Sequence, residues 1–296
     1  LYYNIADFSV WDYTTGMKDV AARRLRLIGD PETRYREDPV RMLRAIRFAA
    51  KLDFSIHESA AAPIPELGHL LRDVPAARLF DEVLKLFLSG HAVRSFELLS
   101  EYGLFEYLFP ATAERLRGRD GQLVHDFISR GLADTDERVA QDKSITPMFL
   151  YAVMLWPPIQ VMAQGFAERD ELPPAGALAE ACYQAMLTQQ ACTSLPKRYS
   201  VPMREILQLQ YRFENRKGAR AARFLSHKRF RAAYDFMVLR ASCGEVDEEI
   251  AQWWTDVQHR SEAEAKQAFG VGRRKSTGRR GGRRRRSRAQ ADKSQS

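Results

Sequence analysis

The chain has 296 residues with a net charge of +8, and 45% of its residues are hydrophobic and 28% charged, as is typical of a globular protein with one large or two modest domains. Its three cysteines are odd in number and lack C-x-x-C spacing, which excludes a disulfide framework and a cysteine zinc site and fits a reducing compartment, so the cytoplasm is the expected location. The longest apolar run, 148–156, is too short to cross a bilayer.

Two short strands are predicted before residue 30. Residues 7–13 alternate between apolar and polar side chains, and residues 25–28 have a similar pattern. Because two short strands do not form an independent sheet, we expect them to complete a sheet whose other strands lie outside this chain. The chain opens on Leu1 without a signal peptide, so we expect it to be a fragment that begins in mid-sequence.

Helices dominate the pattern after residue 30, which predicts a mainly α fold. Asp38 and Pro39 form a helix start, with the aspartate as N-cap and the proline in the first turn, and the helix is expected to continue to about Leu52. Apolar residues recur along one face of it at steps of three and four: Val40, Leu43, Ile46 and Ala50.

Further helices follow, with prolines and glycines at their boundaries. An apolar helix is predicted to start at Thr146 and to end at Trp156, because Pro157 and Pro158 come next. From about residue 268 onward glycine, arginine and serine dominate, which predicts disorder. The other predicted helices cover about 75–88, 91–101, 176–192, 199–214, 219–226, 228–243 and 245–258.

Charge is distributed unevenly along the chain. Residues 272–296 carry +10, whereas residues 1–271 carry −2. Within the latter part, residues 197–240 carry +9 and residues 241–271 carry −5. A local positive excess on a segment predicted to be folded favours a polyanionic partner.

An E-D-x-x-R element stands at the predicted helix start, where Glu37 and Asp38 lie beside the guanidinium of Arg41. Arg44 and Arg47 follow at steps of three on the same face. Carboxylates accept hydrogen bonds from exocyclic amino groups and arginine donates to ring nitrogens or phosphate, which is the chemistry that reads a nucleobase edge. The alternative is a solvated face with ordinary ion pairs, each worth about 0.3–0.5 kcal/mol.

The stretch 26–52, together with 1–8 and 12–19, resembles the neck region of the bacterial poly(A) polymerase and CCA-adding enzyme family of class II nucleotidyltransferases. The family's D-x-x-x-G-x-x-D element, a hinge between head and neck, corresponds to Asp12, Gly16 and Asp19, although Thr15 replaces the first of its usual paired glycines. The E-D-x-x-R element acts as a protein template for the incoming base in CCA-adding relatives. Since both activities share it, it does not identify the nucleotide.

Later stretches favour the poly(A) polymerase branch of the family. Residues 195–199, 206–212 and 230–240 look like the body of gammaproteobacterial poly(A) polymerases, and the arginine-rich tail is similar too. The resemblance implies four parts: a head remnant (1–29), a helical neck that binds nucleotide and RNA (30–109), a helical body that binds RNA (110–267) and a disordered basic tail (268–296) that helps to hold RNA.

The activity that the resemblance implies is template-independent transfer of AMP from ATP to RNA 3′ ends in mRNA polyadenylation and RNA decay, with RNA-decay proteins as further partners. The catalytic carboxylates that hold two Mg²⁺ ions belong to a head that precedes Leu1, so no catalytic or metal-binding residue is assigned here and the chain alone is expected to be inactive. A tRNA CCA-adding nucleotidyltransferase and a non-catalytic helical RNA-binding protein are the alternatives.

Basic and aromatic residues alternate within 197–223. Basic side chains neutralise phosphates and aromatic rings stack on unpaired bases, so we expect RNA contact there. The aromatic residues Tyr199, Tyr211 and Phe213 fit a stacking role and a core role equally well. The basic set comprises Lys197, Arg198, Arg204, Arg212, Arg216, Lys217, Arg220 and Arg223.

Two further side chains, Glu82 and Arg44, are predicted to have a structural and a supporting role, respectively. Glu82 stands four residues after Arg78 on a predicted helix, and an intrahelical ion pair with a structural role is expected. Arg44 is expected to orient the E-D-x-x-R residues or to contact phosphate.

Overall fold

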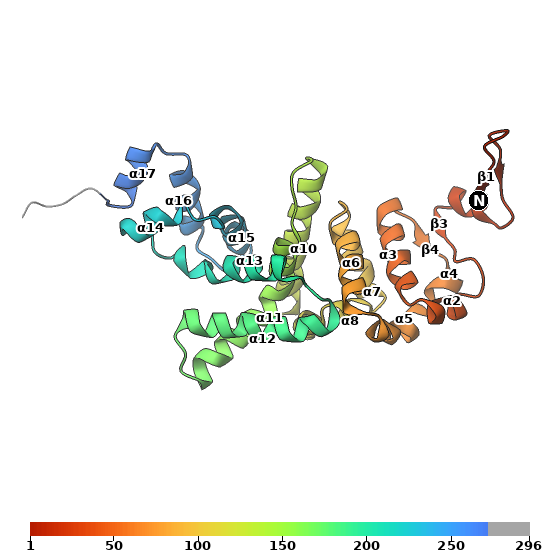
Figure 1. The fold of residues 1–296 in the computed structure, drawn as a ribbon, viewed down its shortest axis with the longest axis horizontal. Helices are drawn as coiled ribbons and strands as arrows, with labels where there is room; N and C mark the ends of the chain where they lie inside the picture. The colour runs from red at the N-terminus through yellow and green to blue at the C-terminus, as the bar shows by residue number, and fades with distance from the viewer. Residues whose placement is uncertain (272–296) are drawn as a thin grey trace, which may run out of the picture.

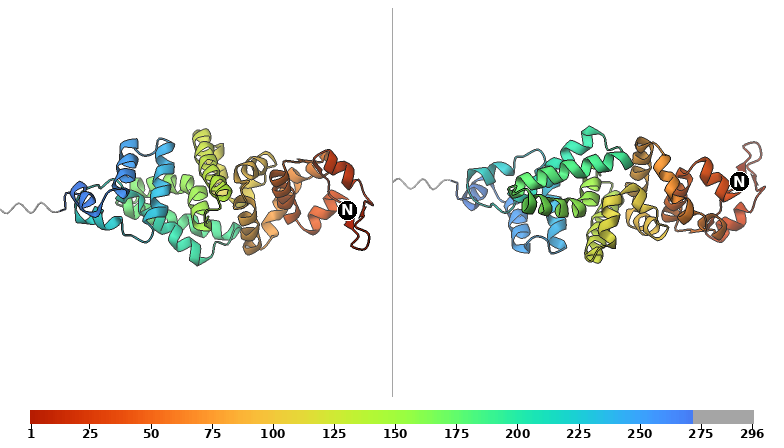
Figure 2. Two further views of the ribbon diagram at one scale, coloured as in Figure 1. Left: turned by 90° about the horizontal axis from the view of Figure 1, so that it is seen from above. Right: turned by 90° about the horizontal axis from the view of Figure 1, so that it is seen from below.

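A computed structural model describes residues 1–271 of the chain as an elongated succession of helices (Figure 1). Both views in Figure 2 place the N-terminal part at one end of the long axis and the C-terminal helices at the other. The predicted mainly α fold is confirmed. None of the helices within the described range is long and apolar enough to cross a membrane.

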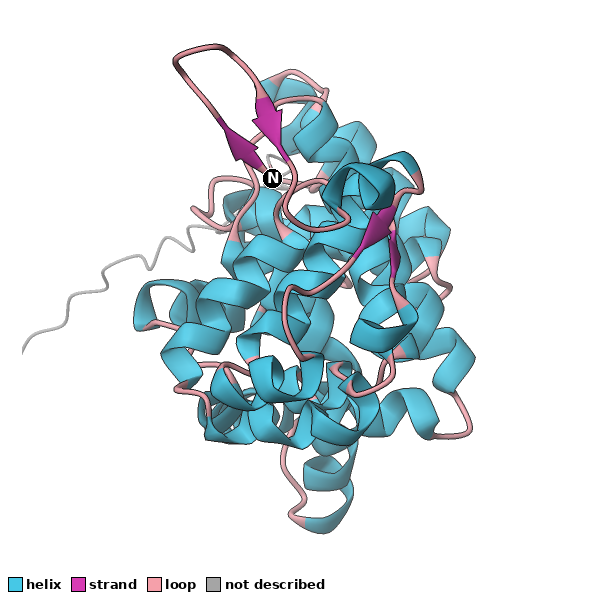
Figure 3. Ribbon diagram, turned by 90° about the vertical axis from the view of Figure 1, so that its right-hand side faces the viewer, coloured by secondary structure: helices cyan, strands magenta, loops and turns pink. Residues whose placement is uncertain are grey.

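Two small pairs of strands occupy the N-terminal end of the molecule (Figure 3). β1 and β2 pair in antiparallel fashion, with Tyr2 opposite Trp11. β3 pairs in parallel with β4, with Arg24 opposite Ser55. The expectation that the two predicted strands pair with strands outside the chain is therefore wrong for the described pairings, because β2 pairs with β1 and β3 pairs with β4. The strands are β1 (Tyr2–Tyr3), β2 (Val10–Trp11), β3 (Arg24–Leu25) and β4 (Ser55–Ile56).

The neck packs around α3, which contacts both α6 and α7. The predicted apolar face of α3 is buried, and Leu43 and Ile46 are fully enclosed. α3 begins at Val40, one residue after Pro39, although Pro39 already has helical dihedral angles. The helices of this part are α1 (Gly16–Ala21), α2 (Pro31–Glu37), α3 (Val40–Leu52), α4 (Glu58–Ala61), α5 (Ile64–Leu67), η1 (Gly68–Asp73), α6 (Ala76–Phe87), α7 (Ala92–Glu101) and α8 (Phe105–Leu108).

The body is built on the long helix α11, which packs against α9, α10, α12 and α13. Gly131 of α10 permits the approach of α11, because a Cβ there would lie 2.7 Å from a Val153 methyl group. The helices are α9 (Pro110–Arg117), α10 (Gly121–Ala140), α11 (Pro147–Arg169), α12 (Pro174–Cys192), α13 (Lys197–Gln208), η2 (Gln210–Arg212), α14 (Gly218–Phe224), α15 (Phe230–Ser242), α16 (Glu248–Gln258) and α17 (Glu262–Ala268).

The predicted end of the apolar helix at Trp156 is wrong, because α11 continues through Pro157 and Pro158. A proline inside a helix lacks the N–H that would bond to the carbonyl four residues earlier, which for Pro158 is that of Met154. The buried hydroxyl of Thr112 on α9 donates to this carbonyl at 2.7 Å. A tertiary contact therefore replaces one of the missing helical hydrogen bonds.

The helical structure continues past residue 267, where the sequence predicted a disordered tail. α17 ends at Ala268, and Phe269 is buried against Trp253 and Trp254. The prediction of disorder is thus wrong for residues 268–271. The remainder of the predicted basic tail, 272–296, lies outside the described residues.

Candidate nucleotide and RNA interface

The E-D-x-x-R residues lie at the corner between α2 and α3. Asp30 fixes the start of α2 by accepting a hydrogen bond from the backbone N–H of Thr33 at 2.8 Å. Glu37 is the last residue of α2, and Asp38 has an extended backbone (φ −148°, ψ 95°) that ends this helix. Arg41 lies in the first turn of α3, so the element spans two helices instead of one.

Glu37 and Arg41 form the predicted ion pair. Arg41 Nη1 donates to Glu37 Oε2 at 2.9 Å and to the backbone carbonyl of Arg34 at 3.0 Å. Arg34 Nη1 donates to the same Glu37 oxygen at 2.8 Å. The hydrogen bond from Arg41 and the nearby charges of both arginines lower the pKa of Glu37, so this carboxylate is ionised at neutral pH.

Asp38 pairs with a different arginine from the one expected. Its carboxylate lies 2.9 Å from the Arg78 guanidinium of α6, which connects the corner to the next layer of the neck. The predicted pair between Arg78 and Glu82 is therefore wrong. The sequence spacing allowed that pair, but Arg78 turns towards α3, where the second acidic residue of the motif is within reach.

Glu82 forms the buried centre of a second charged cluster. Its side chain is only 3% exposed and its carboxylate lies 2.8 Å from Lys85 Nζ, 3.5 Å from Arg47 Nη1 and 3.9 Å from Arg44 Nε. Arg44 thus faces Glu82 and does not contact the E-D-x-x-R carboxylates. Three cations around one buried carboxylate leave a positive excess on this side of α3.

The corner keeps hydrogen-bonding groups available at the surface. The Glu37 side chain is 49% exposed and that of Arg41 is 25% exposed. Within residues 1–271, the contacts of this pair use Glu37 Oε2 and Arg41 Nη1 and leave Glu37 Oε1 and Arg41 Nη2 without a hydrogen bond. A ligand edge that offers one donor and one acceptor can meet these two atoms.

The predicted hinge residues stabilise the short helix α1. The Asp12 carboxylate accepts hydrogen bonds from the backbone N–H groups of Gly16 and Met17, at 3.2 and 2.8 Å. Asp19 accepts two hydrogen bonds from Arg26, at 2.8 and 3.1 Å, and these lower its pKa to about 2. A side chain at position 16 would meet Asp12 Oδ1 at 3.3 Å, so the glycine permits this capping.

The predicted basic residues of the body lie on α13, η2 and α14 and in the loop that precedes α14. Most are exposed, whereas Arg204 and Arg216 are half-buried. Arg216 forms an ion pair with Glu249 of α16 at 2.8 Å, which is part of the acidic segment that follows in the sequence. Arg212 lies over the ring of Phe224 at 5.7 Å. These two arginines have structural contacts in addition to any role in RNA binding.

The aromatic residues of this segment divide between core and surface. Phe213 is 1% exposed and packs edge-on against Phe224 and Trp254, so it belongs to the core. Tyr199 is half-buried beneath Arg198. Tyr211 is 39% exposed, and it remains the candidate for base stacking.

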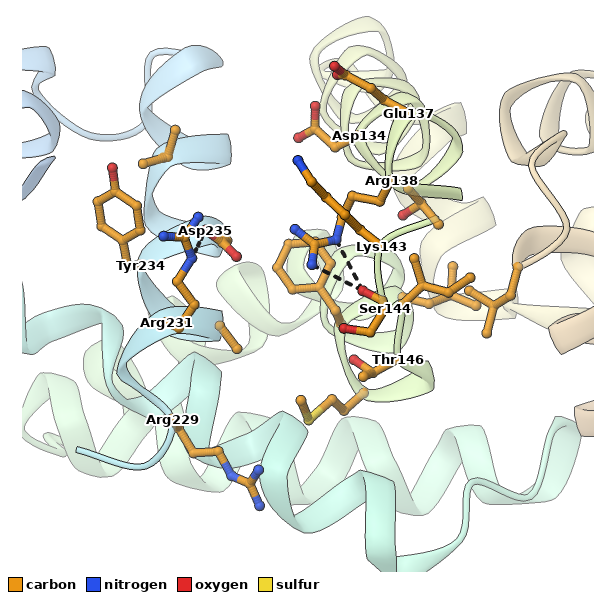
Figure 4. A pocket seen from close by; sticks show the side chains of 18 of the residues that line it. Asp134, Glu137, Arg138, Lys143, Ser144, Thr146, Arg229, Arg231, Tyr234 and Asp235 are labelled. Carbon is orange, nitrogen blue, oxygen red and sulfur yellow. Dashed lines mark hydrogen bonds and ion pairs between the residues drawn. The ribbon is translucent and has the colours of Figure 1, made fainter. Parts of the chain in front are cut away.

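A cleft in the body contains cations that the sequence did not single out. It lies between α10 with its following loop and α15, and it has a volume of about 560 Å³ (Figure 4). Its basic side chains are Arg138, Lys143, Lys228, Arg229 and Arg231. Lys228, Arg229 and Arg231 belong to the segment 197–240 with its charge of +9, and this excess was the only sequence signal for the cleft. Arg138 and Lys143 come from the end of α10 and the loop that follows it, far away in the sequence.

Comparisons with known proteins place this geometry in a family. Residues 53–116 match a family described as "Probable RNA and SrmB- binding site of polymerase A", and residues 170–290 match "Polymerase A arginine-rich C-terminus". Poly(A) polymerase I of Salmonella typhi is 44% identical over 270 residues, which are 90% of this chain. The chain belongs to the bacterial poly(A) polymerase family.

A second poly(A) polymerase is similarly close to this chain, whereas a CCA-adding enzyme is more distant. Poly(A) polymerase I of Escherichia coli O6:H1 is 45% identical over 87% of the chain, whereas the CCA-adding enzyme of Leuconostoc citreum is 34% identical over 34% of it and 25% of the relative. A solved structure of a tRNA-processing enzyme shares the fold, with a TM-score of 0.56 and 16% identity over 90% of this chain and 70% of that one. The chain spans only 58% and 56% of the two poly(A) polymerase relatives.

Proposed function

We propose that this chain is the base-selecting and RNA-binding part of a polynucleotide adenylyltransferase, which adds AMP from ATP to RNA 3′ ends without a template. The main support is the 44–45% identity with Poly(A) polymerase I over nearly the whole chain. The corner formed by Glu37, Asp38 and Arg41 is the base-reading site of this proposal, and the basic surface of α13 and α14 holds RNA.

The corner matches the Watson–Crick edge of adenine in its hydrogen-bonding groups. Adenine offers an exocyclic amino donor beside a ring-nitrogen acceptor. The unused Glu37 Oε1 accepts from the amino group, while Arg41 Nη2 donates to the ring nitrogen. Arg34 and Arg78 hold the two carboxylates in place, so little side-chain freedom is lost when the base binds.

The same pattern disfavours uracil and guanine, which present a carbonyl where adenine presents an amino group. A carbonyl facing the Glu37 carboxylate leaves both oxygens without a donor, and such a mismatch costs roughly 1–3 kcal/mol. Cytosine shares the donor and acceptor order of adenine. The choice of ATP in this proposal therefore rests on the similarity to poly(A) polymerases and not on the corner alone.

The carboxylates that bind magnesium in this proposal do not belong to this chain. Among residues 1–271, no three His, Cys, Asp or Glu side chains lie close enough together to hold a metal ion. The contribution of this chain is to bind and orient the base and the RNA. We place the protein in the cytoplasm, with RNA 3′ ends and proteins of RNA decay as its partners.

The test is nucleotide incorporation by the complete gene product, with RNA as acceptor. Glu37→Gln and Arg41→Gln should each lower kcat/KM for ATP roughly 10- to 100-fold, because a good base-edge contact is worth about 1–3 kcal/mol. Discrimination against UTP should fall in the same variants, since the groups that reject its carbonyl edge are altered.

Arg36→Gln is the matched control, because Arg36 is an exposed arginine of α2 that pairs with Glu32 in the helix. It should leave kcat/KM within about twofold of the parent. An Arg41→Gln enzyme as active and selective as the Arg36→Gln enzyme would refute the base-reading role. Incorporation of CTP into tRNA by the parent would instead identify a CCA-adding enzyme.

A further inference from the structure

The cleft between α10 and α15 is separate from the corner that reads the base. One wall is the last turn of α10 with the loop that leads to α11, and the other is the first part of α15. Figure 4 shows Lys143 and Arg138 on the first wall and Asp235 on the second, with Arg231 lying along its own helix beside Asp235.

The first wall is fixed by its backbone. The N–H of Lys143 donates to the carbonyl of Arg138 at 2.8 Å, and the N–H of Asp142 donates to that of Val139 at 3.1 Å. This is a Schellman ending, with Asp142 in the left-handed conformation at φ 52°. The Arg138 guanidinium binds the carbonyl of Ser144 at 3.0 and 3.2 Å. Lys143 therefore projects from a well-defined turn.

The second wall presents cations that are only partly neutralised. Arg231 pairs with Asp235 of the same helix at 3.0 Å, and its side chain is 74% exposed. Lys228 and Arg229 share the single carboxylate of Glu205, at 3.3 and 3.0 Å. Five basic residues line the cleft against three acidic ones: Asp134, Glu137 and Asp235.

The floor of the cleft is apolar. It is formed by Leu88, Met148, Phe149 and Val238, of which Phe149 is half-buried and Val238 is 37% exposed. An apolar floor between cationic walls suits a ligand with a flat apolar face and a negatively charged backbone. Single-stranded nucleic acid has this composition.

The acidic side chains add a preference among bases. Asp134 makes no hydrogen bond or ion pair with the other residues of the range 1–271. The loss of surrounding water raises the pKa of Asp134; Arg130 opposes this shift, and the charges of Glu137 and Asp235 add to it. A ligand that donates a hydrogen bond to Asp134 stabilises the charged form of this carboxylate, which its surroundings disfavour.

We propose that this cleft holds a stretch of single-stranded RNA, with phosphates against Lys143 and Arg231 and with amino-bearing bases, adenine above all, donating to Asp134. The inference rests on the proposed RNA-binding function and assigns it a second site, distant in sequence from the corner. A polymer of adenylate offers an amino donor on every base, so it suits this acidic and basic lining better than a polymer of uridylate.

The test is the binding of fluorescein-labelled oligoadenylate and oligouridylate to the chain, followed by anisotropy at several KCl concentrations. Lys143→Gln with Arg231→Gln should raise Kd for oligoadenylate about tenfold. The slope of log Kd against log salt should fall by about 1.4, because each phosphate contact on a single strand contributes roughly 0.7. Lys143→Arg with Arg231→Lys keeps both charges and should preserve the slope.

Arg117→Gln with Arg169→Gln is the matched control, since both side chains are exposed and lie outside the cleft. An equal loss in this control would overturn the proposal in favour of general attraction between charges. Unchanged binding by the cleft variant of a parent that binds RNA would also overturn it, yet leave the proposed function intact. A parent chain that binds neither oligonucleotide would instead contradict the RNA-binding function itself.

Asp134→Ala tests the base contact separately. It should narrow the preference for oligoadenylate over oligouridylate while leaving the salt slope unchanged, because it removes an acceptor for the amino group and no phosphate contact. An unaltered preference would overturn the assignment of adenine to this wall.

Discussion

The corner in the neck and the cleft in the body both combine arginine or lysine with carboxylates, but they assemble them in different ways. The motif residues of the corner, Glu37, Asp38 and Arg41, lie within five consecutive positions. Glu37 pairs directly with Arg41, and Asp38 pairs with Arg78 of α6. The main cations of the cleft, Lys143 and Arg231, are far apart in the sequence, and they face the same cleft from opposite walls. Motifs that are local in sequence can be read from the sequence, whereas sites made by packing cannot.

The two regions also differ in how their acidic groups are neutralised. In the neck the buried Glu82 is surrounded by three cations, and each carboxylate of the corner has an arginine partner. In the cleft Asp134 lacks such a partner among the described residues. The carboxylates of the neck thus have protein partners before any ligand arrives, whereas the exposed Asp134 carboxylate remains accessible to a ligand. The following changes test this contrast, from the largest expected effect to the smallest.

Glu82→Gln should destabilise the neck most. It removes the negative charge at the centre of Arg44, Arg47 and Lys85 and leaves these cations close together, at a cost of about 3 kcal/mol in the free energy of unfolding. Urea denaturation monitored by circular dichroism measures this change. Glu97→Gln is the control, because it breaks an exposed pair with Arg94 and should cost less than about 1 kcal/mol. Equal effects would show that the buried cluster does not stabilise the neck.

Thr112→Val should destabilise the body by about 2 kcal/mol, since the Met154 carbonyl beside the two prolines of α11 would lose its donor in a buried environment. The same denaturation measurement applies. Thr188→Val removes an exposed hydroxyl that bonds to its own helix, and it should change stability by less than about 0.5 kcal/mol. If both variants matched the parent, another group would have to satisfy that carbonyl.

Asp142→Gly should stabilise the body by about 1 kcal/mol, because glycine adopts the left-handed conformation at the end of α10 without strain. Thermal unfolding should show a small rise in Tm. Asp142→Ala lacks this freedom and serves as the control, with no gain expected. A higher Tm for the alanine variant would show that the aspartate charge, and not its backbone, limits stability.

Asp19 should titrate at an unusually low pH for an aspartate. Its folded-state pKa of about 2 lies below the ordinary value of 3.8, so the Arg26 contact is fully stabilising above pH 3.8 and is lost as the pH falls through 2. Carboxyl-carbon NMR titration measures this value directly. In an Arg26→Gln variant the pKa should return towards 3.8, and a pKa that stays near 2 would contradict the assigned cause.

The sequence by itself determined the helical class, most helix positions and the ion pair of the E-D-x-x-R element. These depend on periodicity, on capping residues and on contacts between residues three or four positions apart, which a single helix or helix start already brings together. The buried face of α3 followed from the same spacing, and Leu43 and Ile46 lie where it predicted.

Only the tertiary structure determined which charged residues form ion pairs when the sequence spacing allows several. It also determined which prolines occur inside a helix. Arg78 pairs with Asp38 because α6 packs beside α3, and at Pro158 of α11 the Thr112 hydroxyl replaces the missing helical hydrogen bond to the Met154 carbonyl. Helix packing likewise places Phe213 in the core and Lys143 at the cleft. Burial and long-range contacts depend on the packing of whole helices, and no local pattern contains that information.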